Sequence, residues 1–357
     1  MDKLLEDARI VATSQYNLTV DSLTLIESGR VNASFKVVAG DQAYNLQRLN
    51  DFFESYPALG NNWLLTQKAF TQSQLPFPGI VPDGSGDLLS RYNGAWRLTQ
   101  WLPGQVPKSG SLEVCHLAGR FLGLAHRALN VPQPLTYLEK LPPKWEFTNQ
   151  RLPSPADFEN IFLDYRRHPN LGLIAPAIIR ATERAKNLPT RPSFTRVFLA
   201  RDMVIHGDPK RENFLEAEGA AGGEGRMALV DWDTVGYGDL LIDLGELCRS
   251  FSVEKPNPAF KFDLALAALK GYLETGVETL DRIALLLPAV IRALSLCLIR
   301  RYLIDALAEV YFSWDPKNFD SLFAQNEARA LALLEMIEDM EDLEMEFTKA
   351  ILGLGGQ

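Results

Sequence analysis

The chain has 357 residues, 46% of them hydrophobic and 23% charged, so it can bury a sizeable core and is long enough for two lobes or domains. Its formal net charge of −9 argues against the positive surface that nucleic-acid binding requires, and no nucleic-acid partner is expected. Cys115, Cys248 and Cys297 are too scattered for a metal site or a disulfide framework, so reduced, buried thiols are expected.

Short helical and strand-like segments follow one another in the first hundred residues. An amphipathic helix opens the chain, and a second helix is predicted over 63–73. Strands are predicted over 23–26, 32–38, 42–49, 87–92 and 95–102. Asn93-Gly94 joins the last two strands and is a strong signal for a two-residue hairpin turn. This part of the chain therefore predicts a small β-rich lobe.

The pattern changes after residue 102. Pro103, Gly104 and Pro107 break the chain, and apolar residues then recur at helical spacing from Ser111 to a long helix over 319–348. We expect an α+β fold with two lobes, a β-rich lobe over residues 1–102 and a larger, mainly helical lobe over 103–357. A cleft between two rigid lobes is a common place for a ligand site.

Two features bear on localisation. The opening residues, MDKLLEDARI, lack the apolar core and cleavage site of a signal peptide. The most apolar run, 283–299, is short for a membrane span and contains Pro288 and Arg292, so a buried core helix is predicted. A cytoplasmic protein without a membrane partner is expected.

Two polar turns, each preceded by an apolar strand, stand out in the second half of the chain. The first turn contains His206, Asp208 and Asn213, and the second contains Asp231 and Asp233. Phosphoryl transfer needs a carboxylate near the attacking hydroxyl and oxygen ligands that hold Mg²⁺ against the phosphates. An Asp, an Asn five positions later and an Asp on the next strand supply this set. The sequence therefore predicts a small-molecule kinase that uses Mg²⁺ and ATP or GTP.

These turns resemble the motifs of the aminoglycoside phosphotransferase and choline kinase superfamily, which has the protein-kinase-like fold. The matching residues are His206, Gly207, Asp208, Asn213, Asp231, Trp232 and Asp233. The resemblance implies that Asp208 is the catalytic base and that Asn213 and Asp231 bind Mg²⁺. It also implies that Asp233 is a second metal-binding or loop-shaping carboxylate and that His206 orders the loop.

A further set of residues resembles the N-acetylhexosamine 1-kinase branch of this superfamily. The set comprises Asn32, Phe35, the run 44–50, Phe53, Lys210, the run 231–235, Asp243, Gly245, Glu246 and Arg249. The branch implies phosphorylation of the anomeric hydroxyl of an N-acetylhexosamine or a related sugar. Lys210 would neutralise charge on the transferring phosphoryl group, although a surface lysine after Pro209 is the alternative. Asp243 belongs to the Asp-Leu motif of the family and is expected to start a helix.

The nucleotide site departs from the usual kinase pattern. Only Gly29 stands where many kinases have three glycines, and the candidate side chains for phosphate contacts are Arg30, Asn32 and Ser34. The lysine of the third strand is missing, and either Gln47 or Arg48 takes its position, because a one-residue shift in register exchanges their faces. Arg48 would hold a phosphate bidentately, whereas Gln47 would only hydrogen-bond it.

The adenine is expected between the lobes, near the backbone of Gln100, Trp101 and Leu102, although Trp101 alternatively only packs the linker. Other acceptors stay open, namely an amino alcohol, homoserine or an aminoglycoside. An aromatic cage for a choline-type acceptor has four candidates, Trp145, Phe147, Tyr311 and Trp314. The missing lysine also leaves a different class open, a pseudokinase-like module that binds nucleotide for regulation.

Overall fold

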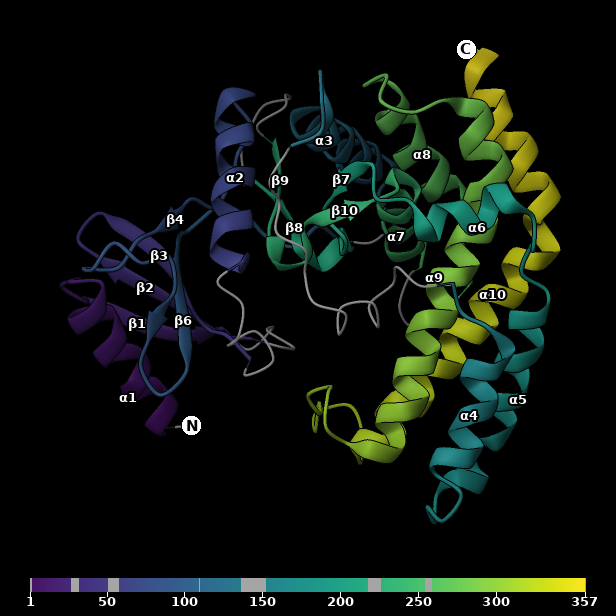
Figure 1. The fold of residues 1–357 in the computed structure, drawn as a ribbon, viewed down its shortest axis with the longest axis horizontal. Helices are drawn as coiled ribbons and strands as arrows, with labels where there is room; N and C mark the ends of the chain where they lie inside the picture. The colour runs from purple at the N-terminus through teal and green to yellow at the C-terminus, as the bar shows by residue number, and fades with distance from the viewer. Residues whose placement is uncertain are drawn as a thin grey trace.

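The computed structural model describes residues 2–26, 32–50, 58–108, 110–135, 152–217, 226–253 and 259–356. Within these ranges the first part of the chain forms an antiparallel sheet, and most of the remainder is helical (Figure 1). This confirms the predicted α+β fold. The expected turn at 28–30 lies outside the described residues.

The sheet has the strand order β1-β2-β3-β6-β4, with β5 paired to β6. Its strands are β1 (Ser22–Ile26), β2 (Ala33–Ala39), β3 (Gln42–Arg48), β4 (Ile80–Val81), β5 (Ser90–Arg91) and β6 (Ala95–Gln100). The strand expected over 87–92 is reduced to β5, because residues 87–89 are irregular or bent, and the Asn93-Gly94 turn follows Tyr92. Alternate residues of β2 and β6 face α1 (Asp2–Ile10), where Phe35, Val37, Trp96 and Leu98 form a small core.

The helix α2 (Ala58–Gln72) links the sheet to the larger lobe, although it comes from the first hundred residues. Its Phe70 ring lies 4.8 Å from the ring of Trp232 and 6.5 Å from that of Phe121, both in the larger lobe. In Figure 1 this helix stands between the sheet and the large helical part. Residue 102, after which a boundary is predicted, lies between the end of β6 and the start of α3 at Leu112.

Eight helices of the described chain build the larger lobe. They are α3 (Leu112–Asn130), α4 (Pro155–Asp164), α5 (Leu171–Lys186), α6 (Pro192–Leu199), α7 (Leu240–Phe251), α8 (Phe262–Leu273), α9 (Leu280–Ala308) and α10 (Leu322–Gly353). Two short strand pairs lie among them, β7 (Met203–Ile205) with β10 (Gly236–Gly238) and β8 (Phe214–Glu216) with β9 (Met227–Leu229). These pairs carry the two polar turns that the sequence singled out.

The helix α9 contains the apolar run predicted to be a core helix. With 29 residues it is longer than the run suggested, and among the described residues it is the one helix long and apolar enough to cross a membrane. However, 78% of its most apolar window is buried inside the protein, where it packs against α10, α7 and α5. This burial favours the role of a central core helix.

Candidate active site

The loop after β7 is held by a buried carboxylate from α7. Asp243 is fully buried and accepts hydrogen bonds from the backbone N–H groups of His206 (2.7 Å) and Gly207 (2.8 Å). It also pairs with the ring of His126, whose Nε2 lies 3.0 Å away. Asp243 lies in the first turn of α7, as expected of a residue at the helix start, but Asp239 supplies the cap. The side chain of Asp243 fixes the loop at its first two residues.

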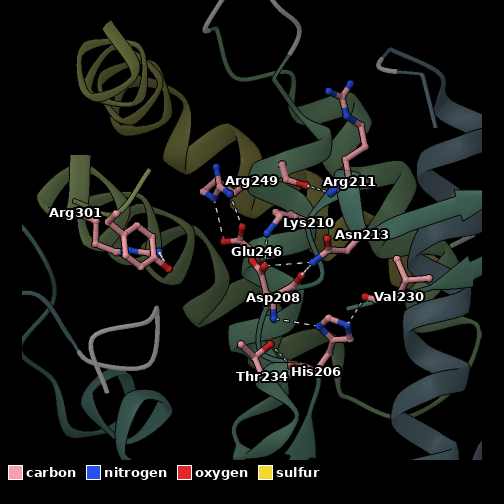
Figure 2. Close-up of polar contacts among 12 residues, drawn as sticks. His206, Asp208, Lys210, Arg211, Asn213, Val230, Thr234, Glu246, Arg249 and Arg301 are labelled. Carbon is pink, nitrogen blue, oxygen red and sulfur yellow. Dashed lines mark hydrogen bonds and ion pairs between the residues drawn. The ribbon is translucent and has the colours of Figure 1, made fainter. Parts of the chain in front are cut away.

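The ring of His206 holds the next part of the same loop, at Asp208. Its Nδ1 accepts a hydrogen bond from the backbone N–H of Asp208 (3.2 Å), and its Nε2 lies 3.0 Å from the carbonyl oxygen of Val230, to which it donates (Figure 2). Burial lowers the pKa of His206 below its ordinary value, although Asp243 and Asp208 act in the opposite direction. A neutral imidazole with this tautomer joins the loop to the strand that leads to Asp231.

Gly207 is required by the backbone of this loop. Its φ of +88° lies in the left-handed region, and a Cβ there would come within 2.7 Å of the carbonyl oxygen of Thr234. The Thr234 hydroxyl in turn donates to the carbonyl oxygen of His206 (2.8 Å). The two polar turns are therefore packed directly against each other.

Asp208, Lys210 and Asn213 converge at the end of the loop (Figure 2). The Lys210 ammonium forms an ion pair with Asp208, and Nδ2 of Asn213 donates to the backbone oxygen (2.8 Å) and the carboxylate (3.2 Å) of Asp208. Burial lowers the pKa of Lys210, but the charges of Asp208 and Asp231 outweigh it, and the pKa ends above its ordinary value. The Asp208 carboxylate is 24% exposed, so it is oriented by two partners and still accessible to a substrate.

Asp231 occupies a strained backbone position at the start of the second turn. Its φ of +65° and ψ of +57° place it in the left-handed region, which a residue with a side chain rarely adopts. Burial and the negative charges of Asp233 and Asp208 raise the pKa of Asp231 to about 7. A half-buried carboxylate beside two like charges suits a divalent cation, and the amide oxygen of Asn213 is a second hard donor beside the same cavity.

Within the described residues, no group of three or more His, Cys, Asp and Glu side chains is arranged to hold a metal ion. Mg²⁺ does not need such a cluster, because it usually takes one or two protein oxygens and completes its shell with water and phosphate. One carboxylate and one amide oxygen therefore fit Mg²⁺ better than a metal that needs a full protein cage.

Asp233 is bound from the other lobe. Arg97 on β6 forms a bidentate ion pair with it, in which one nitrogen–oxygen distance is 3.2 Å, and Nδ2 of Asn32 donates to it at 3.1 Å. Both carboxylate oxygens thus have cationic or amide partners, which favours the loop-shaping role over metal binding. The Arg97 side chain is fully buried and lies over the ring of Trp63, 4.0 Å from its centroid.

Arg97 was not singled out from the sequence. The signal for it was a charged residue in the apolar strand Ala95–Gln100, which is buried along most of its length. Arg97 lies opposite Gln47 in the sheet, and Nη2 of Arg97 donates to Oε1 of Gln47 at 2.6 Å. The cation that the sheet directs at Asp233 is therefore Arg97 on β6, and it does not come from β3.

A cavity of about 850 Å³ lies between the sheet and the larger lobe. Most predicted site residues line it, namely Asn32, Gln47, Gln100, Trp101, Leu102, Lys210, Asn213 and Asp231. Arg48 does not, because its guanidinium is bonded to the backbone oxygens of Asn93 (3.1 Å) and Leu49 at the hairpin. The register thus turns Gln47 toward the cavity and Arg48 away from it. Arg30 lies outside the described residues.

The linker between the lobes offers backbone groups to this cavity. The N–H groups of Gln100 and Trp101 are used by the sheet, since they donate to the carbonyl oxygens of Gly79 (2.7 Å) and Ala43 (3.0 Å). Of these three linker residues, Leu102 alone has a backbone N–H without a partner among the described residues. The Trp101 ring is covered by the ammonium of Lys36, 4.7 Å from its centroid.

Beyond Lys210, the larger lobe contributes a buried ion pair. Glu246 and Arg249 of α7 are joined by two contacts, one of them 3.0 Å from Nε of Arg249, and Figure 2 shows them beside Lys210 and Asp208. Arg301 of α9 donates to the hydroxyl of Tyr311 at 2.8 Å, and its guanidinium lies over the Tyr311 ring. Trp145 and Phe147 lie outside the described residues.

The fold and the loop together define a bilobal phosphotransferase of the kinase type. Residues 22–286 match the model of the phosphotransferase enzyme family, and the chain belongs to this family. As a member of this family, the chain is an enzyme that transfers a phosphoryl group to an alcohol, as the sequence predicted. No curated protein matches the sequence.

Solved structures share this fold. The chain is similar to an aminoglycoside phosphotransferase from Alicyclobacillus acidocaldarius subsp. acidocaldarius DSM 446, with 16% identity, a TM-score of 0.61 and coverage of 94% of this chain and 95% of that chain. It is similar to a microcompartment-associated aminopropanol kinase, with 16% identity, a TM-score of 0.62 and coverage of 93% and 96%. An amicoumacin kinase in complex with AMP-PNP and Ca²⁺ shows 14% identity, a TM-score of 0.59 and coverage of 95% and 96%.

Proposed function

We propose that the protein transfers the γ-phosphoryl group of ATP or GTP, with Mg²⁺, to a hydroxyl of a neutral sugar, specifically the anomeric hydroxyl of an N-acetylhexosamine or a related hexose. The observation that carries the kinase part is the convergence of Asp208, Lys210 and Asn213 beside a cavity that also receives Asp231. We further propose that the enzyme acts in the cytoplasm.

In this proposal each residue has a separate task. Asp208 orients the acceptor hydroxyl and takes its proton, and Lys210 places a positive charge next to the transferring group. Asn213 and Asp231 hold Mg²⁺, which neutralises charge on the phosphate oxygens. The N–H of Leu102 is the donor we assign to the base of the nucleotide, and Gln47 and Asn32 border the phosphates.

The charge of the cavity supports a neutral acceptor over a polycationic antibiotic. Among the residues that line it, the acids are Glu212, Asp231 and Asp315, and the cations are Lys210, Lys317 and Arg329. Three acids against three cations give no net attraction for an aminoglycoside, and one of the acids, Asp231, is assigned to Mg²⁺.

The aromatic rings argue against a choline-type acceptor. A quaternary ammonium needs the faces of several rings, but nearby faces already carry cations of the protein itself. Trp63 carries Arg97, Trp101 carries Lys36 and Tyr311 carries Arg301, with centroid distances of 4.0, 4.7 and 4.9 Å. A neutral polyol, bound by directional hydrogen bonds, is the acceptor that this lining favours.

A phosphorylation screen tests the proposed function. The purified protein with Mg-ATP, and separately with Mg-GTP, is offered N-acetylglucosamine, N-acetylgalactosamine, galactose, ethanolamine, choline, homoserine and kanamycin, and nucleoside diphosphate release is measured. We expect turnover of a sugar and a product that no longer reacts as a reducing sugar. Turnover of an amino alcohol, homoserine or kanamycin alone would exclude the sugar but not the kinase.

A further inference from the structure

The loop between α9 and α10 reaches the same cavity as the catalytic residues. Residues 313–318, here called the 313–318 loop, line it together with Lys210, Asn213 and Asp231, although they lie about a hundred positions later in the chain. In Figure 1 the connection between the two helices points away from the helical bundle, at its lower end. The loop is therefore one wall of the site and not a remote connection.

The approach to this loop is fixed by a buried carboxylate. Asp305 is 2% exposed and accepts the backbone N–H groups of Val310 (2.9 Å), Tyr311 (2.7 Å) and Phe312 (3.0 Å). Its second oxygen also accepts a hydrogen bond from Nδ2 of Asn326 at 3.0 Å. Three N–H groups on one buried carboxylate hold the backbone in a single path after the end of α9.

The loop itself is held by α10. Gln325 is buried, and its side chain accepts from the N–H of Asp315 (2.8 Å) and donates to the carbonyl oxygen of Ser313 (2.9 Å). Gln325 thus holds the backbone on both sides of Trp314. A binding loop that is ordered before the ligand arrives loses less entropy when it binds.

Trp314 is a large apolar side chain left in solvent by this arrangement. It is 50% exposed, and its Nε1 donates to the carbonyl oxygen of Phe319 at 2.9 Å, which fixes the orientation of the indole. Unlike Trp63, Trp101 and Tyr311, it has no aromatic ring or cationic group against its face within the described part of the chain. Its face is therefore available to a ligand in the cavity.

Asp315 stands next to this ring. Its carboxylate accepts hydrogen bonds from Nδ2 of Asn318 (2.7 Å) and the N–H of Lys317 (3.1 Å). The hydrogen bond from Asn318 lowers the pKa of Asp315. An ionised carboxylate with lone pairs to spare beside a fixed aromatic face combines an apolar contact with acceptors for hydroxyl groups.

We propose that the 313–318 loop is the acceptor subsite, where the face of Trp314 packs against the C–H face of a pyranose ring and Asp315 accepts hydrogen bonds from its hydroxyls. This inference rests on the proposed function and adds the residues that select a sugar. An amino alcohol places only one ammonium group against the indole and has no ring to cover its apolar face, so it buries less apolar surface there.

Steady-state kinetics with a sugar that the wild-type protein phosphorylates test the subsite. Trp314→Ala is expected to raise the KM of the sugar about tenfold, a loss of ~1.4 kcal/mol, while the KM of ATP and kcat change less than about twofold. Trp314→Phe, which keeps an aromatic face, is expected to retain most of the affinity. Val310→Ala is the matched control, because Val310 precedes the loop, is 85% exposed and keeps its backbone bond to Asp305.

The outcomes separate the two claims. If no sugar is phosphorylated, the proposed function and this subsite both fail. If a sugar is phosphorylated but its KM is unchanged in Trp314→Ala, or only the KM of ATP rises, the subsite is wrong and the proposed function stands. If Trp314→Ala does not fold, Asp315→Asn carries the test. It keeps the shape of the side chain, and we expect it to raise the KM of the sugar about fivefold, whereas an unchanged KM would overturn the subsite.

Discussion

Arg97 and Asp233 join the sheet to the catalytic segment through a pair that is almost completely buried. A buried ion pair costs desolvation energy, and removal of one partner leaves the other charge without compensation. We expect Arg97→Met to lower the free energy of unfolding by about 3 kcal/mol and to raise the KM of ATP, because Asp233 and the turn around Asp231 lose their support. Arg97→Lys should recover part of both, since it keeps the charge but loses the bidentate geometry.

Denaturant unfolding and nucleotide kinetics of the two variants check this role. The double variant Arg97→Met with Asp233→Leu should be more stable than Arg97→Met alone, because no unpaired charge remains in it. Wild-type stability and an unchanged KM of ATP in Arg97→Met would contradict the assignment of Arg97 as a positioning residue.

His206 makes the stability of the protein depend on pH in a defined direction. Its pKa is lowered by burial, so the unfolded chain takes up a proton near the ordinary value of 6.5 while the folded protein does not. The free energy of unfolding should therefore fall as the pH drops below 6.5, by at most about 1.4 kcal/mol per pH unit from this group. His206→Gln should show a shallower dependence between pH 6.5 and 5, measured by urea unfolding. Equal slopes in both proteins would count against a neutral, buried His206.

The residues of the catalytic loop could be predicted because their signal is local. His206, Asp208 and Asn213 follow one another within eight positions after an apolar strand. Their spacing in the sequence does not depend on how the rest of the chain folds. Arg97 could not be found in this way, since its partner Asp233 is 136 positions away and the pair depends on how the lobes meet. The choice between Gln47 and Arg48 stayed open for a related reason, because a shift of one residue in a strand exchanges its two faces.

At the scale of elements, α3 and α8 approach each other closely because of two glycines. A Cβ on Gly119 of α3 would overlap the backbone carbonyl of Ala268, and one on Gly271 of α8 would overlap that of His116. Since α3 also carries His126, which pairs with Asp243, this contact helps to place the catalytic loop. The sequence predicted a helical lobe from Ser111 onward but not how closely two of its helices approach, which depends on packing between distant segments.

Gly119→Ala should destabilise the protein by more than about 2 kcal/mol, although alanine favours a helix by about 1 kcal/mol over glycine. The matched control is Gly172→Ala in α5, where the added Cβ meets nothing within 4 Å, so this variant should be neutral or slightly stabilising. Thermal unfolding of both variants measures the difference. Similar melting temperatures for the two would show that the backbones of α3 and α8 can move apart at little cost.

For the whole molecule, the two lobes meet around a cavity that residues of both lobes line. The sheet and the linker border the side assigned to the nucleotide. The loops after β7 and β9 bring Asn213 and Asp231 to the cavity, and Asp208 is bonded to Asn213 beside it. The sequence predicted this division because a change from strand to helix patterns is visible along the chain. The wall formed by the connection from α9 to α10 was not visible, because it reaches the site only through the packing of the helical lobe.

The measurement that tests the account most directly compares Asp208→Asn with Asp231→Ala in phosphoryl transfer and in nucleotide binding. Asp208→Asn should lower kcat about 10³-fold and leave the melting-temperature increase caused by Mg-ATP intact, because it removes the base but not the metal ligands. Asp231→Ala should lower kcat and also raise the Mg²⁺ concentration needed for half-maximal rate. Near-wild-type turnover by a folded Asp208→Asn protein would contradict the central claim that this carboxylate receives the proton of the acceptor.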